Sequence, residues 1–176
     1  DFNGAASLQI TTNDQGNSGS GGPLLSLIPI CLCRRTVYYT SVYTLPRSQS
    51  THEDTTLVFS SGNSNQISIS DLDVGANPVQ VTLTGTNGTV TLAGTTGLTF
   101  SVGDGTSDAT MTFTGTIANI NTALNGLSFG PTADFNGAAS LQITTNDQGN
   151  SGSGGPLSDS DTVNITVNAV DDAPVN

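Results

Sequence analysis

Carboxylates are the side chains in this sequence whose pairing and placement suggest chemistry, and that chemistry is cation binding. The 176 residues include 14 Asp and Glu but only three Arg and no Lys, which gives a net charge of −11 and an isoelectric point near 4.1. Two acidic pairs stand out, Asp71 with Asp73 and Asp171 with Asp172. Calcium takes about six to eight oxygen ligands, and carboxylates in turns supply them. The pairs are therefore either metal ligands or turn residues that cap backbone groups.

Other reactive side chains favour structural interpretations. Asp104 and Asp108 share one short loop, GDGTSD, which has too few ligands for an ion, so we expect turn residues. His52 stands alone beside an acidic residue and is expected to be solvated. Cys31 and Cys33 lie two residues apart, where a disulfide would be strained, and one distant histidine does not complete a zinc pattern.

Nucleic-acid binding and enzymatic activity find little support. Nucleic acid requires Lys and Arg clustered against phosphate, and this chain is strongly acidic. It has a single His, no Lys and therefore no phosphate loop with its lysine. The glycine-rich run at 149–155 lacks a following helix and is typical of a flexible connection. We expect no enzyme, no nucleic-acid partner and, because no apolar run has transmembrane length, no membrane insertion.

Residues 1–24 recur without a single change at residues 134–157. A perfect repeat of this length indicates a tandem array of near-identical modules. We expect residues 1–45 to be the truncated C-terminal part of a preceding repeat and residues 46–170 to be one complete module. Residues 171–176 would then be the linker to the next repeat.

The segment 25–47 departs from the repeat. After Leu157 the second copy continues SDSDTVNITVNAVDDAPVN, whereas after Leu24 the first copy continues LSLIPICLCRRTVYYTSVY, with the same length but little identity. The segment also holds every Arg, Cys and Tyr of the chain. Two explanations stay open: slippage of the reading frame, or true divergence in which VYYTSVY is the last strand of the upstream module.

Alternation of apolar and polar residues, with many β-branched side chains, predicts eight strands in the module. They are residues 56–59, 66–70, 79–84, 88–92, 98–102, 109–113, 140–144 and 162–167. Asn87-Gly88 predicts a hairpin, and the glycines at 103 and 105 predict another turn. One helix is predicted over 116–124, with Thr116 as its N-cap and Asn125-Gly126 at its end. This pattern predicts an all-β, immunoglobulin-like β-sandwich with one short helix.

Four stretches resemble a cadherin repeat in their order and spacing. They are ISDLD at 69–73, LQITTNDQG at 141–149, the strand at 160–167 and the acidic stretch NAVDDAPV at 168–175. The closest resemblance is to bacterial cadherin-like repeats of very long surface and secreted adhesins. It covers residues 46–176 fully and residues 1–24 as the tail of the preceding copy.

The resemblance implies calcium sites at the boundaries between modules. One half of the downstream junction would be formed by Glu53, Asp134, Asp171 and Asp172, and one half of the upstream junction by Asp71, Asp73 and Asp147. Asn136, Asn168 and Val170 stand where cadherins carry stronger oxygen ligands. We therefore expect calcium to bind weakly to this chain and better in the intact array.

The resemblance implies a structural repeat of a large extracellular adhesin, which acts as a calcium-stiffened stalk or spacer at the cell surface. Its partners would be neighbouring repeats of the same chain. The alternative is a carbohydrate- or protein-binding β-sandwich module. The sequence has no Trp, and its Tyr residues all lie in 25–47, which speaks against an aromatic sugar platform. Homophilic contacts, or contacts with surfaces or polysaccharides, stay open.

Overall fold

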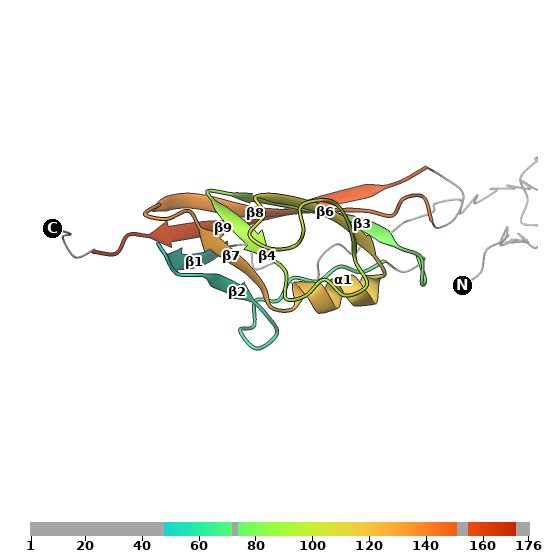
Figure 1. Cartoon of the computed structure of the whole chain (residues 1–176), viewed down its shortest axis with the longest axis horizontal. Coiled ribbons are helices and arrows are strands. Elements are labelled where there is room, and N and C mark those ends of the chain that lie inside the picture. The colour runs from blue at the N-terminus through green and yellow to red at the C-terminus, as the bar shows by residue number, and fades with distance from the viewer. Residues whose placement is uncertain (1–47, 72–73, 151–154, 172–176) are drawn as a thin grey trace, which may run out of the picture. The chain divides into compact units, whose positions relative to one another are not determined.

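A computed structural model describes residues 48–71, 74–150 and 155–171, in which nine strands and one helix are found (Figure 1). In chain order the elements are β1 (Ser48–His52), β2 (Leu57–Phe59), β3 (Val79–Thr86), β4 (Gly88–Thr91), β5 (Thr99–Val102), β6 (Thr110–Gly115), α1 (Ile117–Leu124), β7 (Leu127–Pro131), β8 (Gly137–Asn146) and β9 (Ser158–Asn168). The predictions for residues 1–45 and 25–47 lie outside the described residues.

Two sheets pack face to face. The larger has six strands in the order β1-β9-β8-β3-β6-β5, and the smaller has three in the order β2-β7-β4. Figure 1 shows the two layers edge-on, with α1 on the side of the smaller sheet. All neighbouring strands are antiparallel except β1 and β9, which run parallel. The predicted all-β sandwich with one short helix is confirmed at this level of architecture.

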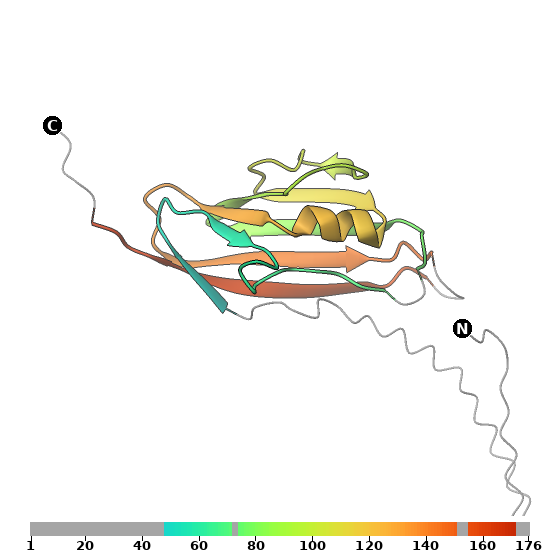
Figure 2. The same cartoon turned by 90° about the horizontal axis from the view of Figure 1, so that it is seen from below.

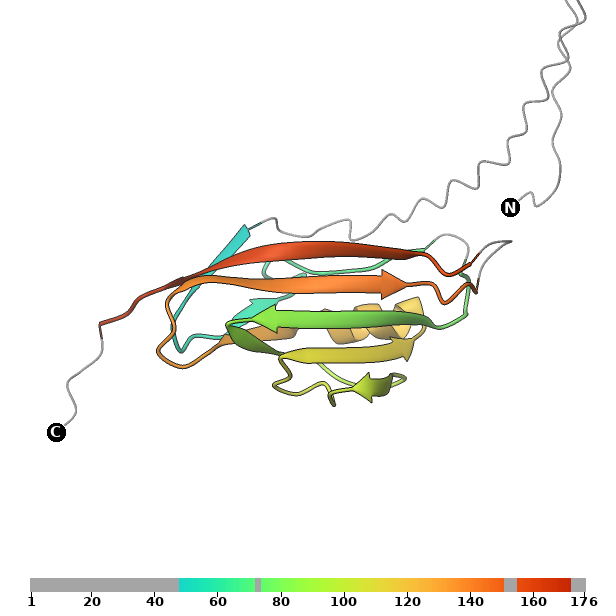
Figure 3. The same cartoon turned by 90° about the horizontal axis from the view of Figure 1, so that it is seen from above.

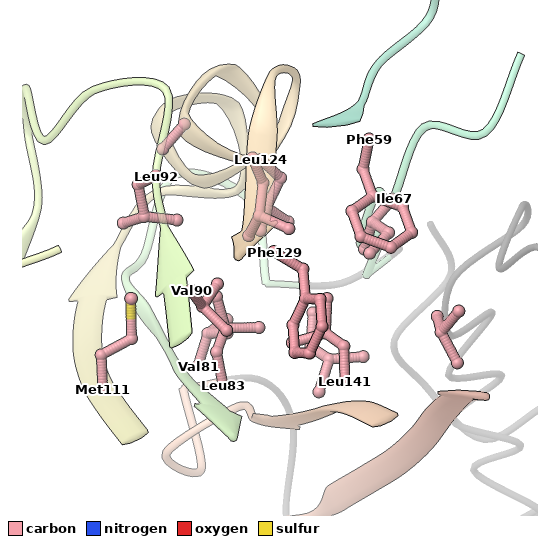
Figure 4. Packing of buried hydrophobic residues seen from close by; sticks show 14 of the residues in the cluster. Phe59, Ile67, Val81, Leu83, Val90, Leu92, Met111, Leu124, Phe129 and Leu141 are labelled. Carbon is pink, nitrogen blue, oxygen red and sulfur yellow. The ribbon is translucent and has the colours of Figure 1, made fainter. Parts of the chain in front are cut away.

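The core forms because alternate residues of each strand point inward. In β3 the side chains of Val79, Val81 and Leu83 are fully buried, whereas the residues between them are partly exposed. Phe59 and Phe129 from the smaller sheet pack among these aliphatic side chains (Figure 4). Burial of each large apolar side chain contributes about 1.5–3 kcal/mol, so this continuous cluster is the main source of stability.

Helix α1 is built as its sequence predicts. The Thr116 side chain accepts a hydrogen bond from the Asn119 backbone N–H at 3.3 Å, which confirms the N-cap. Ile120 and Leu124 are fully buried against the core. Gly126 follows with a φ of 108°, and its N–H donates to the Phe59 carbonyl at 2.8 Å. No helix in the described ranges is both long and apolar enough to cross a membrane.

The strand predicted at 66–70 is wrong. Ile67 and Ile69 are buried in alternation, but the segment pairs with no strand among the described residues. Instead Asn121 of α1 takes the place of a neighbouring strand. Its Oδ1 accepts from the Ile69 N–H at 2.8 Å, and its Nδ2 donates to the Ile69 carbonyl at 2.9 Å. Alternate side chains of this segment are therefore buried although the segment is not part of a sheet.

The hairpin predicted at Asn87-Gly88 is also wrong, because β3 and β4 belong to different sheets. Asn87 adopts a φ of 56°, and the chain turns sharply from one layer into the other. β4 pairs with β7, with Gly88 opposite Pro131 and Thr89 opposite Gly130. The tight turn is real, but it is a corner between layers.

Strands β1 and β7 were not predicted. The sequence of β1, SQSTH, is polar, and that of β7, LSFGP, is short and ends in Gly-Pro. The other seven strands match predicted segments, and the turn between β5 and β6 joins antiparallel neighbours as expected.

Candidate functional site

Glu53, Asp134 and Asp171 lie at the end of the sandwich where β1 and β9 finish. Because β1 and β9 run parallel, the residues that follow them emerge side by side (Figure 2). The Glu53 N–H donates to the Asn168 carbonyl at 3.0 Å. Asp134 reaches the same end in the connection between β7 and β8. The structure thus places the three described members of the predicted downstream group at the same end of the sandwich.

Glu53 is the fixed centre of this end. Only 6% of its surface is exposed. Its Oε1 accepts a hydrogen bond from the Val170 N–H, and its Oε2 accepts from Asn136 Nδ2 at 3.5 Å. These bonds tie the residue after β1 to the chain that leaves β9, in which Asp171 directly follows Val170.

Asp54 belongs to this end as well. Its Oδ1 accepts from the Asp134 N–H at 3.4 Å, and both residues have a positive φ, 58° and 57°. Their side chains are exposed to solvent. Asp54 was not among the predicted ligands, although it directly follows Glu53 in the sequence. A fourth carboxylate is therefore close to the predicted group.

Asp71 and Asp147 lie at the opposite end. Strand β8 runs from Gly137 to Asn146 and separates Asp134 from Asp147 by roughly 30 Å. Asp71 precedes a turn and accepts from the Val74 N–H at 3.2 Å. Three residues beyond Val74, Asn77 donates to the Asn150 carbonyl at 3.3 Å, close in sequence to Asp147. The two groups predicted for two different junctions therefore lie at two different ends.

Asp147 also holds the backbone around the connection from β8 to β9. It is fully buried, and its Oδ1 accepts from the Gly149 N–H at 2.9 Å and the Leu157 N–H at 2.7 Å. Charge-assisted bonds of this kind contribute about 1.5–3 kcal/mol each. This residue therefore has a structural role that does not depend on a metal ion.

The donor chemistry of both ends suits calcium, because every candidate ligand is an oxygen. Yet no three His, Cys, Asp or Glu side chains within 48–71, 74–150 and 155–171 gather closely enough to hold a metal ion. Asp73 and Asp172, one from each predicted group, lie outside the described residues. A complete calcium site would require ligands in addition to the described residues of one module.

The structural interpretation of the GDGTSD loop is confirmed. Asp108 Oδ2 accepts from the backbone N–H groups of Asp104 and Gly105 at 3.0 and 2.9 Å, and Asp104 Oδ1 accepts from the Thr106 N–H at 2.9 Å. His52 is exposed, as expected for a solvated residue. Asp104 and Asp108 stabilise the loop, and neither they nor His52 were predicted as metal ligands.

An acidic pair on β9 escaped sequence reasoning. Asp159 and Asp161 are in phase with the buried Val163, Ile165 and Val167, so both point toward the interior at the start of the strand. Burial raises the pKa of Asp161, and the neighbouring Asp159 charge raises it further. The signal was present in the sequence as SDSD at 158–161, one residue before the alternating VNITV at 163–167. Inward-pointing charges on strands near a sheet edge are a known guard against wrong pairing.

Asp161→Asn is expected to stabilise the fold by about 0.2–1 kcal/mol at pH 7, because it removes a like-charge contact on one face of a strand. A pKa raised by folding means that the protonated carboxyl favours the folded state, and this gain is lost as the pH rises through the raised pKa. The advantage of the variant should therefore shrink as the pH falls toward the ordinary value of 3.8. Urea unfolding at pH 7 and pH 4 measures it.

The control for that experiment is Thr162→Asn, which places the same side chain on the outward face of β9. It should change stability equally at both pH values. A stability gain for Asp161→Asn that does not depend on pH would contradict a contribution from the titration of this carboxyl.

No protein-family model matches the chain, and no curated protein sequence matches it.

Proposed function

We propose that this chain is a structural repeat of a large extracellular adhesin, with an immunoglobulin- or cadherin-like module that calcium stiffens into a stalk. One observation carries the proposal: carboxylates occupy two opposite ends of a single elongated sandwich. Glu53, Asp134 and Asp171 lie at one end, and Asp71 and Asp147 at the other. The perfect recurrence of residues 1–24 at 134–157 supports an array in which such ends face each other.

Facing carboxylates give the array two mechanical states. Without a cation, the acidic ends of successive modules repel each other across the short linker, so the modules swing freely. A calcium ion held by ligands from both modules removes this repulsion and joins the modules through its coordination bonds. Length and stiffness of the array, which set how far a binding domain reaches from the cell surface, then depend on calcium.

The acidic residues at the Glu53 end would contribute to calcium binding in different ways. The Glu53 carboxylate is already positioned by its bonds to Val170 and Asn136, so it needs little further ordering to act as a ligand. Asp134 and Asp171 are exposed and free of such positioning in the hydrogen bonds described above. Glu53 is therefore expected to set the geometry, and the aspartates to supply most of the charge.

Two joined copies of residues 46–176 provide the test. Calcium at about 100 times its dissociation constant should stabilise the pair by roughly 2.7 kcal/mol, because an ion that binds only the folded state must stabilise it. For a protein of this size the melting temperature should rise by about 5–10 °C relative to the chelated form. Scanning calorimetry with calcium or chelator measures the shift.

Paired variants make the result specific. Asp171→Asn with Asp172→Asn should abolish the calcium shift. Asp104→Asn with Asp108→Asn removes the same charge from the GDGTSD loop and should leave the shift intact. A melting temperature that millimolar calcium does not move would rule out the stiffening mechanism and leave a flexible tether.

A further inference from the structure

Four strands of the six-stranded sheet carry uncharged polar side chains on its outer face. Over 110–114 of β6, 80–86 of β3, 140–146 of β8 and 158–166 of β9, every outward-facing residue is Thr, Ser, Asn or Gln. We call these side chains the hydroxyl face. The four strands lie side by side in one layer (Figure 3).

Strand register arranges the hydroxyl face in rows. Thr82 lies opposite both Thr112 and Thr144, and Thr144 lies opposite Ser160, so four hydroxyl groups cross the sheet in one line. Thr82 and Thr112 hydrogen bond at 3.0 Å, and Thr144 and Ser160 at 2.9 Å. Neighbouring rows lie about 7 Å apart along the strands and their members about 4.8 Å apart. The cross-strand bonds hold these side chains in a regular array.

Charge is excluded from this face although the chain is strongly acidic. In the described part of the chain the carboxylates lie at the two ends, in the loop before β6 or, like Asp159 and Asp161, on the inner side of β9. The net charge of −11 makes copies of the chain repel each other. Two copies that meet through the hydroxyl face keep their carboxylates away from the contact.

The chemistry of the hydroxyl face is complementary to itself. Hydroxyl and carboxamide groups both donate and accept hydrogen bonds, whereas a carboxylate only accepts. A second copy therefore offers a partner for every group on the first. The described outward side chains in these four ranges include no aromatic ring, so a neutral polysaccharide, which proteins usually grip by ring stacking, is the less favoured occupant.

The size of the face suits a weak contact. The hydroxyl face spans 28 residues on four strands, which at about 3.4 Å per residue and 4.8 Å between strands cover roughly 450 Å² per copy, a little over half of the ~800 Å² per partner of a standard interface. A single module would thus bind its copy weakly. An array of near-identical modules repeats the contact, and the gain in avidity requires no new interaction.

We propose that the hydroxyl face is a self-association surface, through which two copies of this chain pack face to face. The contact is independent of calcium and of the proposed stalk function. In a strongly acidic protein its affinity rises with salt, because screening weakens the repulsion between the copies while the contact itself has no ion pairs to lose. That salt dependence is opposite to the one expected for an interface built on salt bridges.

Sedimentation velocity of the full chain in chelator tests the proposal. The average mass should rise from 17.8 kDa toward that of a dimer between micromolar and millimolar concentration, and more steeply at high sodium chloride. Thr144→Glu places a charge in the central row of each copy and should weaken association by at least about tenfold. Ser128→Glu adds the same charge to the outer side of β7 in the smaller sheet and should leave association unchanged.

Three results would overturn the proposal. One is a chain that stays monomeric at millimolar concentration and high salt. The second is an equal loss of association in Ser128→Glu and Thr144→Glu when both variants melt like the parent chain, since this would indicate general repulsion. The third is a monomeric chain that binds an insoluble neutral glucan and loses that binding in Thr144→Glu, since the occupant would then be a polysaccharide. The calcium shift of the joined modules bears on none of them.

Discussion

Gly88→Ala should destabilise the sandwich by about 3 kcal/mol and lower its melting temperature by roughly 10 °C. A Cβ atom at this position would lie 2.4 Å from Phe129 Cζ and 2.6 Å from the Gly130 carbonyl oxygen. Neither of these two atoms can move away without a large cost in packing or hydrogen bonding. The Phe129 ring is fully buried among core side chains (Figure 4), and Gly130 belongs to the ladder between β4 and β7. Relief of the clash would require the two strands to separate.

Gly94→Ala is the matched control. No heavy atom lies within 4 Å of the Cβ position at Gly94, and its φ is not positive. The variant should be neutral or slightly more stable, because alanine restricts the unfolded chain more than glycine does. Urea unfolding of both variants measures the difference. Equal stability of the two alanine variants would show that the approach of β4 to Phe129 is not as close as the structure places it.

At Asn87-Gly88 the sequence predicted the turn but not the sheet that the following strand joins. A tight turn with an Asn in the left-handed region serves a hairpin and a corner between layers equally well. What separates the two is the partner of β4, and that partner is β7, some forty residues further along the chain. The local sequence therefore cannot indicate which sheet β4 joins.

Strands with strong alternation were predictable because their pattern records burial directly. Segments 79–84 and 162–167 appear as parts of β3 and β9. The polar β1 forms five backbone pairings with β9, and its sequence has no apolar alternation, so no local signal marked it. For the segment 66–70 the error was the opposite one. Its alternate residues are buried as in a strand, but no strand pairs with it in the described part of the chain.

The two acidic ends were predictable for a simpler reason. A residue just before a strand and a residue just after it must lie at opposite ends of the sandwich. Asp134 precedes β8 and Asp147 follows it, so this single strand separates the two. The structural role of Asp147 was not predictable, since it depends on the N–H groups of Gly149 and Leu157 that a long connection brings back. The proposed calcium sites would need a second module, and Asp73 and Asp172 lie outside the described residues.

Asn121→Ala should cost about 2–4 kcal/mol, although the side chain lies on a short helix at the edge of the core. The substitution leaves both the N–H and the carbonyl of Ile69 without their partner, and each unsatisfied group costs about 1–3 kcal/mol. Ile69 is only 4% exposed, so water cannot readily replace the lost bonds. Thr122→Ala, on the solvent side of the same helix, loses only a bond to the Ala118 carbonyl and should be nearly neutral. Thermal or urea unfolding of both variants gives the comparison.

Asn121→Asp separates the role of the amide from that of its size. An ionised Asp still accepts from the Ile69 N–H but meets the Ile69 carbonyl with a second acceptor, so the fold should lose stability at pH 7. Protonation restores a donor, which raises the pKa of this Asp in the folded state, and stability should therefore recover as the pH falls. Recovery in acid for Asn121→Asp, and none for Asn121→Ala, is the expected pattern. If both variants kept the stability of the parent chain, the segment 66–70 would be held by burial of Ile67 and Ile69 alone, and the helix side chain would not be its partner.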